Sequence, residues 1–331
     1  MNIICFGEVM LRLSPFMYQK LEQSKSFSLD FGGSESNVAV TLAQLKQDVR
    51  YVTRVPNTGF GQAALNSLNQ FGIDTSHSIF GGDRLGIYFV ELGSGRRSSK
   101  VIYDRKNSGM HSLQTGMFDW QQICSDANWF HWSGITPALS KNAADACKEA
   151  IIYAKQAGLK VSCDLNYRSK LWDYGFKPYT IMPELIETCD MIIGDMDVME
   201  TYFQLPCTDM YDGFKKLADR FPNLEYIGLT ERAGFSATHN TYQGYIYHRG
   251  VIEESKKYDL PDMIDRIGSG DAFTAGLIHM LQSNKNTLSD SIEFATATSV
   301  YKHYVPGDMN YFSQEDIFGL IKGQSGGKVK R

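Results

Sequence analysis

Short apolar segments alternate with amphipathic ones along most of this 331-residue chain, and this alternation constrains the fold more than any other feature. The segments that read as buried strands are 1–6, 51–55, 129–132, 160–164, 191–193 and 226–229. The segments with helical spacing are 37–46, 63–71 and 143–157, and the last two are followed by Gly72 and Gly158. Strands separated by helices predict an α/β fold with a doubly wound, mostly parallel sheet and helices on both faces.

Polar residues follow several of these predicted strands directly. Asp164, Asp195 and Thr230 each come at or just after the end of an apolar strand. Parallel sheets of this type bind ligands beyond the carboxyl ends of their strands. We therefore expect these three residues to converge on one crevice.

Two segments, at about 8–31 and 84–107, break the alternating pattern, because they show period-two alternation and turn residues without helical spacing. Within the second, residues 87–92 and 100–103 read as two strands, and Gly93-Ser94-Gly95 forms a turn between them. This is typical of a hairpin. We expect both segments to supply strands to a small separate sheet.

Residues 265–271 (DRIGSGD) precede an apolar segment with helical character. Glycines at 268 and 270 allow turns that a side chain would forbid, and the N–H groups of Gly268, Ser269 and Gly270 at a helix start can bind a phosphate. Asp271 lies where it could accept a proton from a hydroxyl that attacks a phosphoryl group. The alternative is an ordinary glycine loop in which Asp271 only favours the helix dipole.

This segment resembles the D-x-x-G-A-G-D signature of the ribokinase-like (PfkB) family of sugar kinases, with Ser269 in place of alanine. Residues 32–43 (GGSESNVAVTLA) are similar to the family's second signature, a Gly-Gly pair followed by an asparagine, here Asn37. The resemblance extends from the first strand to about residues 306–308. It implies one kinase domain over residues 1–331, a small β-sheet lid that covers the sugar and pairs subunits into a homo-oligomer, and phosphoryl transfer from ATP with Mg²⁺.

Arginines in two segments suggest what the substrate carries. A sugar acid needs a cation for its carboxylate, and arginine suits planar, bidentate recognition. Arg105 follows Tyr103 on one face of the predicted hairpin, and Arg168 lies in residues 164–172 (DLNYRSKLW), beyond a strand end. The alternative is that both arginines lie on the surface, where most arginines are found.

Together these residues resemble the 2-keto-3-deoxygluconate kinase branch of the family. That branch holds its substrate through positions that fall here on Gly33, Tyr88, Tyr103, Arg105 and Arg168, with Asn37 as a further sugar contact. The product would be the 6-phosphate. One alternative is a kinase for fructose, 2-deoxy-5-ketogluconate or a nucleoside. Another is a non-catalytic sugar-binding regulator, but such a protein would not need the base Asp271.

The segment expected to bind the nucleotide matches the family's pattern less closely. The family's usual T-x-G-x-x-G loop is replaced by residues 230–234 (TERAG), so only Thr230 and Arg232, with Gly268 and Gly270, are expected to reach phosphates. Asp197 and Glu200 have the spacing of the family's N-x-x-E, which holds Mg²⁺ through water, and carboxylates suit that ion. The alternative is an acidic helix N-terminus.

Composition excludes several other functions. A net charge of −4 argues against nucleic acid as a partner, and no apolar run approaches the ~18 residues of a membrane span. Six cysteines without metal-ligand spacing, and an N-terminus that reads as a strand and not as a signal peptide, predict a cytoplasmic protein. Residues 323–331 read as a mobile basic tail.

One motif points elsewhere. Residues 59–64 (GFGQAA) match the dinucleotide fingerprint G-x-G-x-x-A, with Asp83 about 20 residues further on. We prefer to interpret it as a tight turn that enters a helix, because Gly72 already ends that helix and Asp83 does not follow a second strand.

Overall fold

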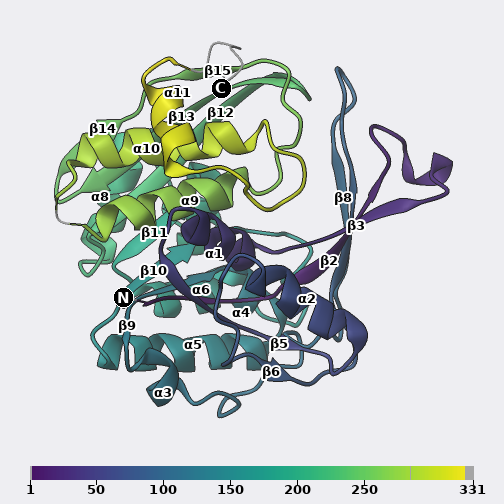
Figure 1. The fold of residues 1–331 in the computed structure, drawn as a ribbon. Helices are drawn as coiled ribbons and strands as arrows, with labels where there is room; N and C mark the ends of the chain where they lie inside the picture. The colour runs from purple at the N-terminus through teal and green to yellow at the C-terminus, as the bar shows by residue number, and fades with distance from the viewer. Residues whose placement is uncertain (1, 284, 325–331) are drawn as a thin grey trace.

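The computed structural model describes residues 2–283 and 285–324, and within them most strands belong to one large sheet (Figure 1). Its order is β14-β13-β12-β11-β10-β9-β1-β4, with β15 paired to β13. From β4 to β12 neighbouring strands are parallel, whereas β13, β14 and β15 pair in antiparallel fashion. The strands are β1 (Asn2–Phe6), β4 (Asp48–Val52), β9 (Ala127–Ser133), β10 (Lys160–Asp164), β11 (Met191–Gly194), β12 (Tyr226–Ser236), β13 (His239–His248), β14 (Val251–Glu254) and β15 (Tyr258–Leu260).

Helices cover both faces of this sheet, which is why its central strands are apolar on both sides. In β1, Ile4 and Phe6 point to one face, and Ile3 and Cys5 point to the other; all four are fully buried. One face carries α3 (Trp120–Cys124), α5 (Lys141–Gln156), α6 (Pro178–Ile186), α7 (Met196–Phe203) and α8 (Met210–Arg220). The other carries α1 (Ser34–Gln44), α2 (Gly59–Asn69), α9 (Ser269–Leu281) and α10 (Leu288–Lys302). The predicted doubly wound α/β fold is confirmed.

A second sheet stands beside the main body at the right of Figure 1. Its order is β3-β2-β7-β8, built from β2 (Met10–Pro15), β3 (Phe27–Gly32), β7 (Ile87–Glu91) and β8 (Lys100–Asp104). The hairpin predicted at 87–103 is confirmed as β7 and β8, but its turn is formed by residues 94–97, where Ser94 and Arg97 exchange two backbone hydrogen bonds, and not by residues 93–95. We call this second sheet the lid. The remaining elements are η1 (Leu21–Gln23), β5 (Arg54–Val55), β6 (Ile79–Phe80), α4 (Ile135–Leu139) and α11 (Gln314–Ile321).

Two predicted boundaries differ from the observed ones for clear reasons. α1 begins at Ser34 and not at residue 37, because the N–H of Asn37 already donates to the carbonyl of Gly33 at 2.8 Å. The strand predicted at 226–229 continues to Ser236, because Thr230 and Arg232 pair in register with β13. Residues 230–234, which replace the family's usual nucleotide loop, are therefore part of a long hairpin.

The residues 59–64 that match a dinucleotide fingerprint begin α2, and the side chain of Thr58 accepts a hydrogen bond from the N–H of Gly61. A side chain at Gly61 would meet the carbonyl oxygen of Pro56 at 2.0 Å, so this glycine is explained by packing. The turn interpretation is confirmed.

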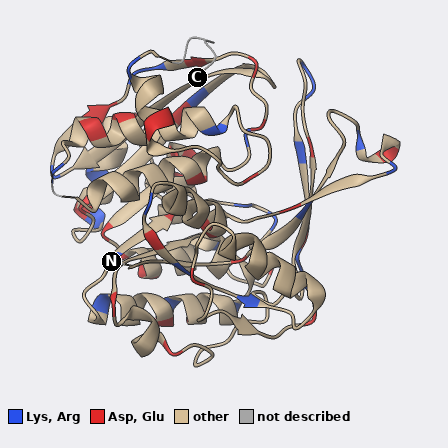
Figure 2. Cartoon of the chain, in the orientation of Figure 1, with Lys and Arg blue, Asp and Glu red and all other residues tan. Residues whose placement is uncertain are grey.

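Charged residues of both signs are spread over the molecule. In Figure 2 basic and acidic residues are interspersed, and no face in that view is covered by basic residues alone. Over the described residues, none of the helices is both long and apolar enough to cross a membrane. Most of the predicted basic tail, residues 325–331, lies outside the described residues.

Candidate active site

A cavity of about 720 Å³ opens at the carboxyl ends of the central strands, between the main sheet and the lid. Its walls include Asp164, Asp195 and Thr230, so the three strand ends predicted to converge do so. The glycine loop, which we define as residues 265–270, and the first turns of α1 and α9 also line it. We refer to this cavity as the cleft.

The glycine loop brings the N-terminus of α9 to the cleft. Gly268 precedes the helix with φ of +83°, and a side chain there would meet the carbonyl oxygen of Asp308 at 2.4 Å. Glycine is therefore required at 268 for both conformation and space. Gly270 is different: its φ is not positive, and no atom lies within 4 Å of the place of a Cβ. The expectation that Gly270 needs a conformation closed to other residues is wrong, and its missing side chain instead leaves the cleft open at this point.

Asp271 lies in the first turn of α9 and is 9% exposed. Its two carboxylate oxygens accept hydrogen bonds from Asn37 Nδ2 at 2.7 Å and from Ser34 Oγ at 3.0 Å. Burial raises its pKa to about 6, although these two hydrogen bonds act in the opposite direction. The site thus holds a carboxylate that is ionised at neutral pH, fixed in orientation, and more basic than an ordinary aspartate.

Gly33 and Asn37, both predicted sugar contacts, lie on the cleft wall next to Asp271. A side chain at Gly33 would collide with the carbonyl oxygen of Glu8 at 2.1 Å, so the backbones there approach closely. Asn37 also donates to Asp308 at 3.2 Å, which links the two carboxylates through one amide. The start of α1 therefore positions the carboxylate of α9.

The lid presents Tyr88, Tyr103 and Arg105 to the cleft, as predicted. The two tyrosine rings pair in register on β7 and β8 and stack with centroids 6.0 Å apart. The hydroxyl of Tyr88 is buried close to Asp308. Arg105 is 5% exposed and forms a buried ion pair with Glu8, a residue that the sequence analysis did not single out.

That ion pair changes what Arg105 can do. Its charge is already balanced by Glu8, so it is not a free cation. Yet among the described residues Arg105 Nε and Glu8 Oε1 are buried without hydrogen-bond partners, and both residues line the cleft. The pair therefore leaves one donor and one acceptor unsatisfied beside the cleft.

Arg168 was predicted to bind the same carboxylate, and it has a different environment. It is exposed on the cleft wall and donates only to the carbonyl of Tyr167, at 3.0 Å. No ion pair joins it to a carboxylate among the described residues, although its charge lowers the pKa of Asp164 and of Asp271. Arg168 is thus a cation on the cleft wall that is available to an anionic substrate.

Two further carboxyl groups line this site: Asp164, which was predicted to lie there, and Glu35, which was not. Burial raises the pKa of Asp164 to about 8, and the neighbouring charge of Asp271 adds to that shift. Glu35 is fully buried, accepts from the N–H and hydroxyl of Ser133 at 3.1 and 2.6 Å, and has a pKa of about 7 for the same main reason. The region below the cleft is therefore rich in carboxyl groups.

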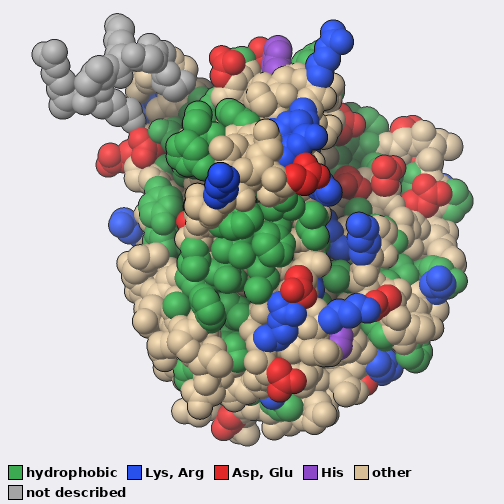
Figure 3. Space-filling model, turned by 90° about the vertical axis from the view of Figure 1, so that its right-hand side faces the viewer, with side chains coloured by type: hydrophobic (Ala, Val, Ile, Leu, Met, Phe, Trp, Pro, Cys, Tyr) green, Lys and Arg blue, Asp and Glu red, His purple; other side chains and the backbone are tan. Residues whose placement is uncertain are grey.

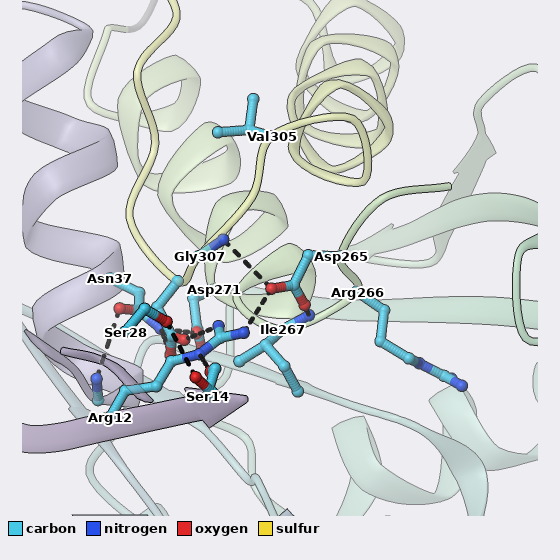
Figure 4. Close-up of polar contacts among 12 residues, drawn as sticks. Arg12, Ser14, Ser28, Asn37, Asp265, Arg266, Ile267, Asp271, Val305 and Gly307 are labelled. Atoms are coloured by element: carbon cyan, nitrogen blue, oxygen red, sulfur yellow. Dashed lines mark hydrogen bonds and ion pairs between the residues drawn. The ribbon is translucent and has the colours of Figure 1, made fainter. Parts of the chain in front are cut away.

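A buried arginine ties the lid to the glycine loop (Figure 4). Arg12, on β2, donates to Asp265 at 2.7 Å and to Asp308 at 2.5 Å, and its Nε donates to Ser14 at 2.9 Å. Burial alone would lower the pKa of Arg12, but Asp308 and Asp265 raise it above the ordinary value. The sequence analysis did not predict these contacts. The signal that could have indicated a buried arginine is the position of Arg12 between apolar residues of a strand.

The predicted phosphate contacts Thr230 and Arg232 both line the cleft. Arg232 Nη2 donates to Ser269 Oγ at 3.0 Å and lies 3.2 Å from the His303 ring. It therefore supports the glycine loop from the side of β12.

The predicted metal residues are placed unequally. Asp197 is exposed on the cleft wall, whereas Glu200, one turn further along α7, does not line the cleft. Within the described part of the chain, no group of three or more His, Cys, Asp or Glu side chains is arranged to hold a metal ion.

Comparisons with known proteins agree with this architecture. The family model described as pfkB family carbohydrate kinase matches residues 1–208. The crystal structure of 2-dehydro-3-deoxygluconokinase from Thermotoga maritima is 35% identical, with a TM-score of 0.93 over 98% of both chains. A 2-dehydro-3-deoxygalactonokinase from Haloferax volcanii is 27% identical over 98% of both chains. A 2-dehydro-3-deoxygluconokinase from Bacillus subtilis is 26% identical over 94% of this chain and 92% of its own.

Proposed function

Because this chain belongs to the pfkB family of carbohydrate kinases, we propose that it transfers the γ-phosphoryl group of ATP to the terminal hydroxyl of 2-keto-3-deoxygluconate, also called 2-dehydro-3-deoxygluconate. The observation that carries this proposal is the place of Asp271. It lies where the sugar-facing residues of α1 meet the N-terminus of α9, with both carboxylate oxygens oriented by hydrogen bonds. A group so placed can act on a hydroxyl and a phosphoryl group at once.

In this proposal Asp271 accepts the proton of the attacking hydroxyl. A general base works best when its pKa is close to the working pH, and a pKa of about 6 meets that condition. The N–H groups of the glycine loop and of the first turn of α9 then stabilise the negative charge on the transferred phosphoryl group. Phosphoryl transfer needs mainly positioning and electrostatic stabilisation, so one base and one anion site suffice.

Recognition of the sugar acid is divided between the two arginines. Arg168 supplies the positive charge for the carboxylate, because Glu8 already balances Arg105. The pair of Arg105 and Glu8 offers a donor and an acceptor, which suit the keto and hydroxyl groups of the same molecule. Neutral sugars would leave the charge of Arg168 unpaired.

ATP and Mg²⁺ belong to the proposal as partners of this site. Thr230, Arg232 and the glycine loop would contact the phosphates. Mg²⁺ in kinases is usually bound by one or two carboxylates together with phosphates and water, so Asp197, which is exposed on the cleft wall, fits such an ion, whereas Glu200 does not line the cleft. When bound, the ion neutralises charge on the phosphates.

The lid suggests a second copy of this chain as a partner. On its outer face Leu29, Leu13, Phe89 and Ile102 lie side by side across all four strands, paired in register. Leu29 and Ile102 are 50% and 37% exposed. Figure 3 shows hydrophobic side chains gathered over this side of the molecule. A continuous apolar face on a sheet is typical of an interface, and we propose a homo-oligomer formed through it.

We also propose a reducing compartment such as the cytoplasm. All six cysteines are free, and five of them are buried. Unpaired thiols in the core are typical of proteins that fold under reducing conditions.

The test of the proposed function is ADP release by the purified protein with a panel of sugars. The panel holds 2-keto-3-deoxygluconate, its galactonate epimer, 2-deoxy-5-ketogluconate, fructose and a nucleoside. The epimer is needed because it carries the same carboxylate and terminal hydroxyl. The account expects a kcat/KM for the two 2-keto-3-deoxy acids at least tenfold above that for fructose; equal values would contradict it.

A further inference from the structure

Lys302, the last residue of α10, is completely buried behind the glycine loop. It does not line the cleft, so it is not placed to touch a substrate. A fully buried lysine is uncommon, because its ammonium group loses hydration on burial. An apolar side chain would fill the same space without that cost, so the charge itself requires an explanation.

Its contacts join it to the loop. Lys302 Nζ donates to the carbonyl of Val305 at 3.0 Å, which holds the turn that leads to Gly307 and Asp308. The aliphatic stem packs under Gly268: a Cβ at 268 would lie 3.2 Å from Lys302 Cε. Figure 4 shows the same turn, at Val305 and Gly307, beside Asp265 and the loop. The lysine thus supports the loop from the side opposite the cleft.

Charged groups lie on several sides of this loop. Asp265, Asp308 and Asp271 are the carboxylates next to it. Arg12 pairs with Asp265 and Asp308, and Arg232 donates to Ser269 Oγ. No carboxylate of the described residues forms an ion pair with Lys302; burial lowers its pKa, and the charges of Asp265, Asp308 and Asp271 oppose that shift. Lys302 adds a cation on the side of the loop away from the cleft.

We propose that Lys302 is a positioning residue for phosphoryl transfer. Its buried ammonium group fixes the turn at 305–308 and supplies positive charge behind the N–H groups that receive the transferred phosphoryl group. This inference rests on the proposed kinase activity. It adds a residue that acts through the loop and not through contact with ATP or sugar. Fixed charges aimed at developing negative charge act strongly where water is excluded.

The experiment compares Lys302→Met with wild type and with Lys155→Met. Methionine keeps the length of the stem and removes the charge. Lys155 is remote from the cleft and pairs with Asp190 at 2.8 Å, so its variant controls for loss of a partly buried lysine. We expect kcat of Lys302→Met to fall by about 10- to 100-fold. The KM for the sugar acid should change less than threefold, and the melting temperature should not fall.

A merely structural lysine would give the opposite pattern, a lower melting temperature with kcat unchanged, and that result would overturn the inference. A kcat for Lys302→Met within twofold of wild type would also overturn it. The wild-type rate on the sugar acids tests the proposed function separately. The ratio of variant to wild type, measured on the best sugar of the panel, tests Lys302.

If Lys302→Met does not yield folded protein, Lys302→Ala is assayed with added methylammonium chloride, and tetramethylammonium chloride serves as the control of equal ionic strength. A small primary ammonium ion can enter the space of the missing side chain, whereas the larger ion cannot donate a hydrogen bond to Val305. Recovery of at least fivefold in kcat with methylammonium alone supports the inference. An equal response to both salts, or no response, contradicts it.

Discussion

Replacing Asp271 by asparagine separates the chemical role of this carboxylate from its effect on stability. Asparagine has the same shape, and its amide can still accept from Asn37 and donate toward Ser34, so the fold should persist. The variant cannot accept a proton. Since general-base catalysis contributes ~10²–10⁴-fold, kcat should fall by that range while sugar binding remains.

The stability effect has the opposite sign. Burial raises the pKa of Asp271 from 3.8 to about 6 in the folded protein. Because the pKa is raised in the folded protein, protonated Asp271 contributes fully to the stability of the fold below pH 3.8. This contribution is lost as the pH rises through about 6. With ~1.4 kcal/mol for each pKa unit, the ionised carboxylate costs about 3 kcal/mol at pH 7 and above. Asp271→Asn is free of this cost, so at pH 7.5 its melting temperature should match or exceed that of wild type.

The assay is kcat from pH 5 to pH 8 together with thermal unfolding at pH 7.5. Wild type should lose activity as the pH falls through about 6, and the residual activity of Asp271→Asn should lack this acidic limb. Asp74→Asn is the matched control, since Asp74 is remote from the cleft and pairs with Arg50, so its loss should lower stability and leave kcat unchanged. An Asp271→Asn rate within threefold of wild type would refute the assignment of the base.

Three other variants test separate parts of the site. Gly268→Ala should disturb the loop and lower the melting temperature, because its Cβ would meet a carbonyl oxygen at 2.4 Å. Gly270→Ala should melt like wild type and lose only activity. Equal melting temperatures for the two variants would contradict this. Glu8→Gln should weaken selectivity for the sugar acid and reduce stability, since breaking a buried ion pair costs about 3–5 kcal/mol; thermal unfolding with and without 2-keto-3-deoxygluconate checks it. Leu29→Glu should shift the protein toward monomer in sedimentation velocity, and an unchanged oligomer would exclude the outer lid face as the interface.

Sequence patterns predicted the fold well because its signals are local. The strand at 160–164 is observed with the predicted bounds, since an apolar run between a glycine-terminated helix and a polar turn leaves few alternatives. The hairpin of the lid was equally clear from its alternation and from the glycines between its two strands, although the turn itself lies at residues 94–97. In both cases the information lies within ten to twenty residues.

The ionic organisation of the site was not predictable in this way. The pairs of Arg105 with Glu8 and of Arg12 with Asp265 join residues 97 and 253 positions apart, so no local pattern reveals them. Arg105 was therefore expected to be a free cation. Lys302 was not singled out, because a lysine at a helix end usually lies in solvent. Which charges neutralise one another is decided by the tertiary fold.

The most direct test of the central claim, a kinase that recognises a sugar acid by its charge, is the steady-state kinetics of wild type and Arg168→Ala with 2-keto-3-deoxygluconate and with fructose. Arg168 is exposed in the cleft and, among the described residues, donates to a backbone carbonyl and forms no ion pair, so its loss breaks no buried salt bridge. A charge-assisted contact to a carboxylate contributes ~1.5–3 kcal/mol. The account predicts that Arg168→Ala loses roughly ten- to a hundredfold in kcat/KM for the acid, mainly through KM, and changes less than threefold for fructose. An equal loss on both sugars would contradict recognition of the substrate carboxylate by this arginine.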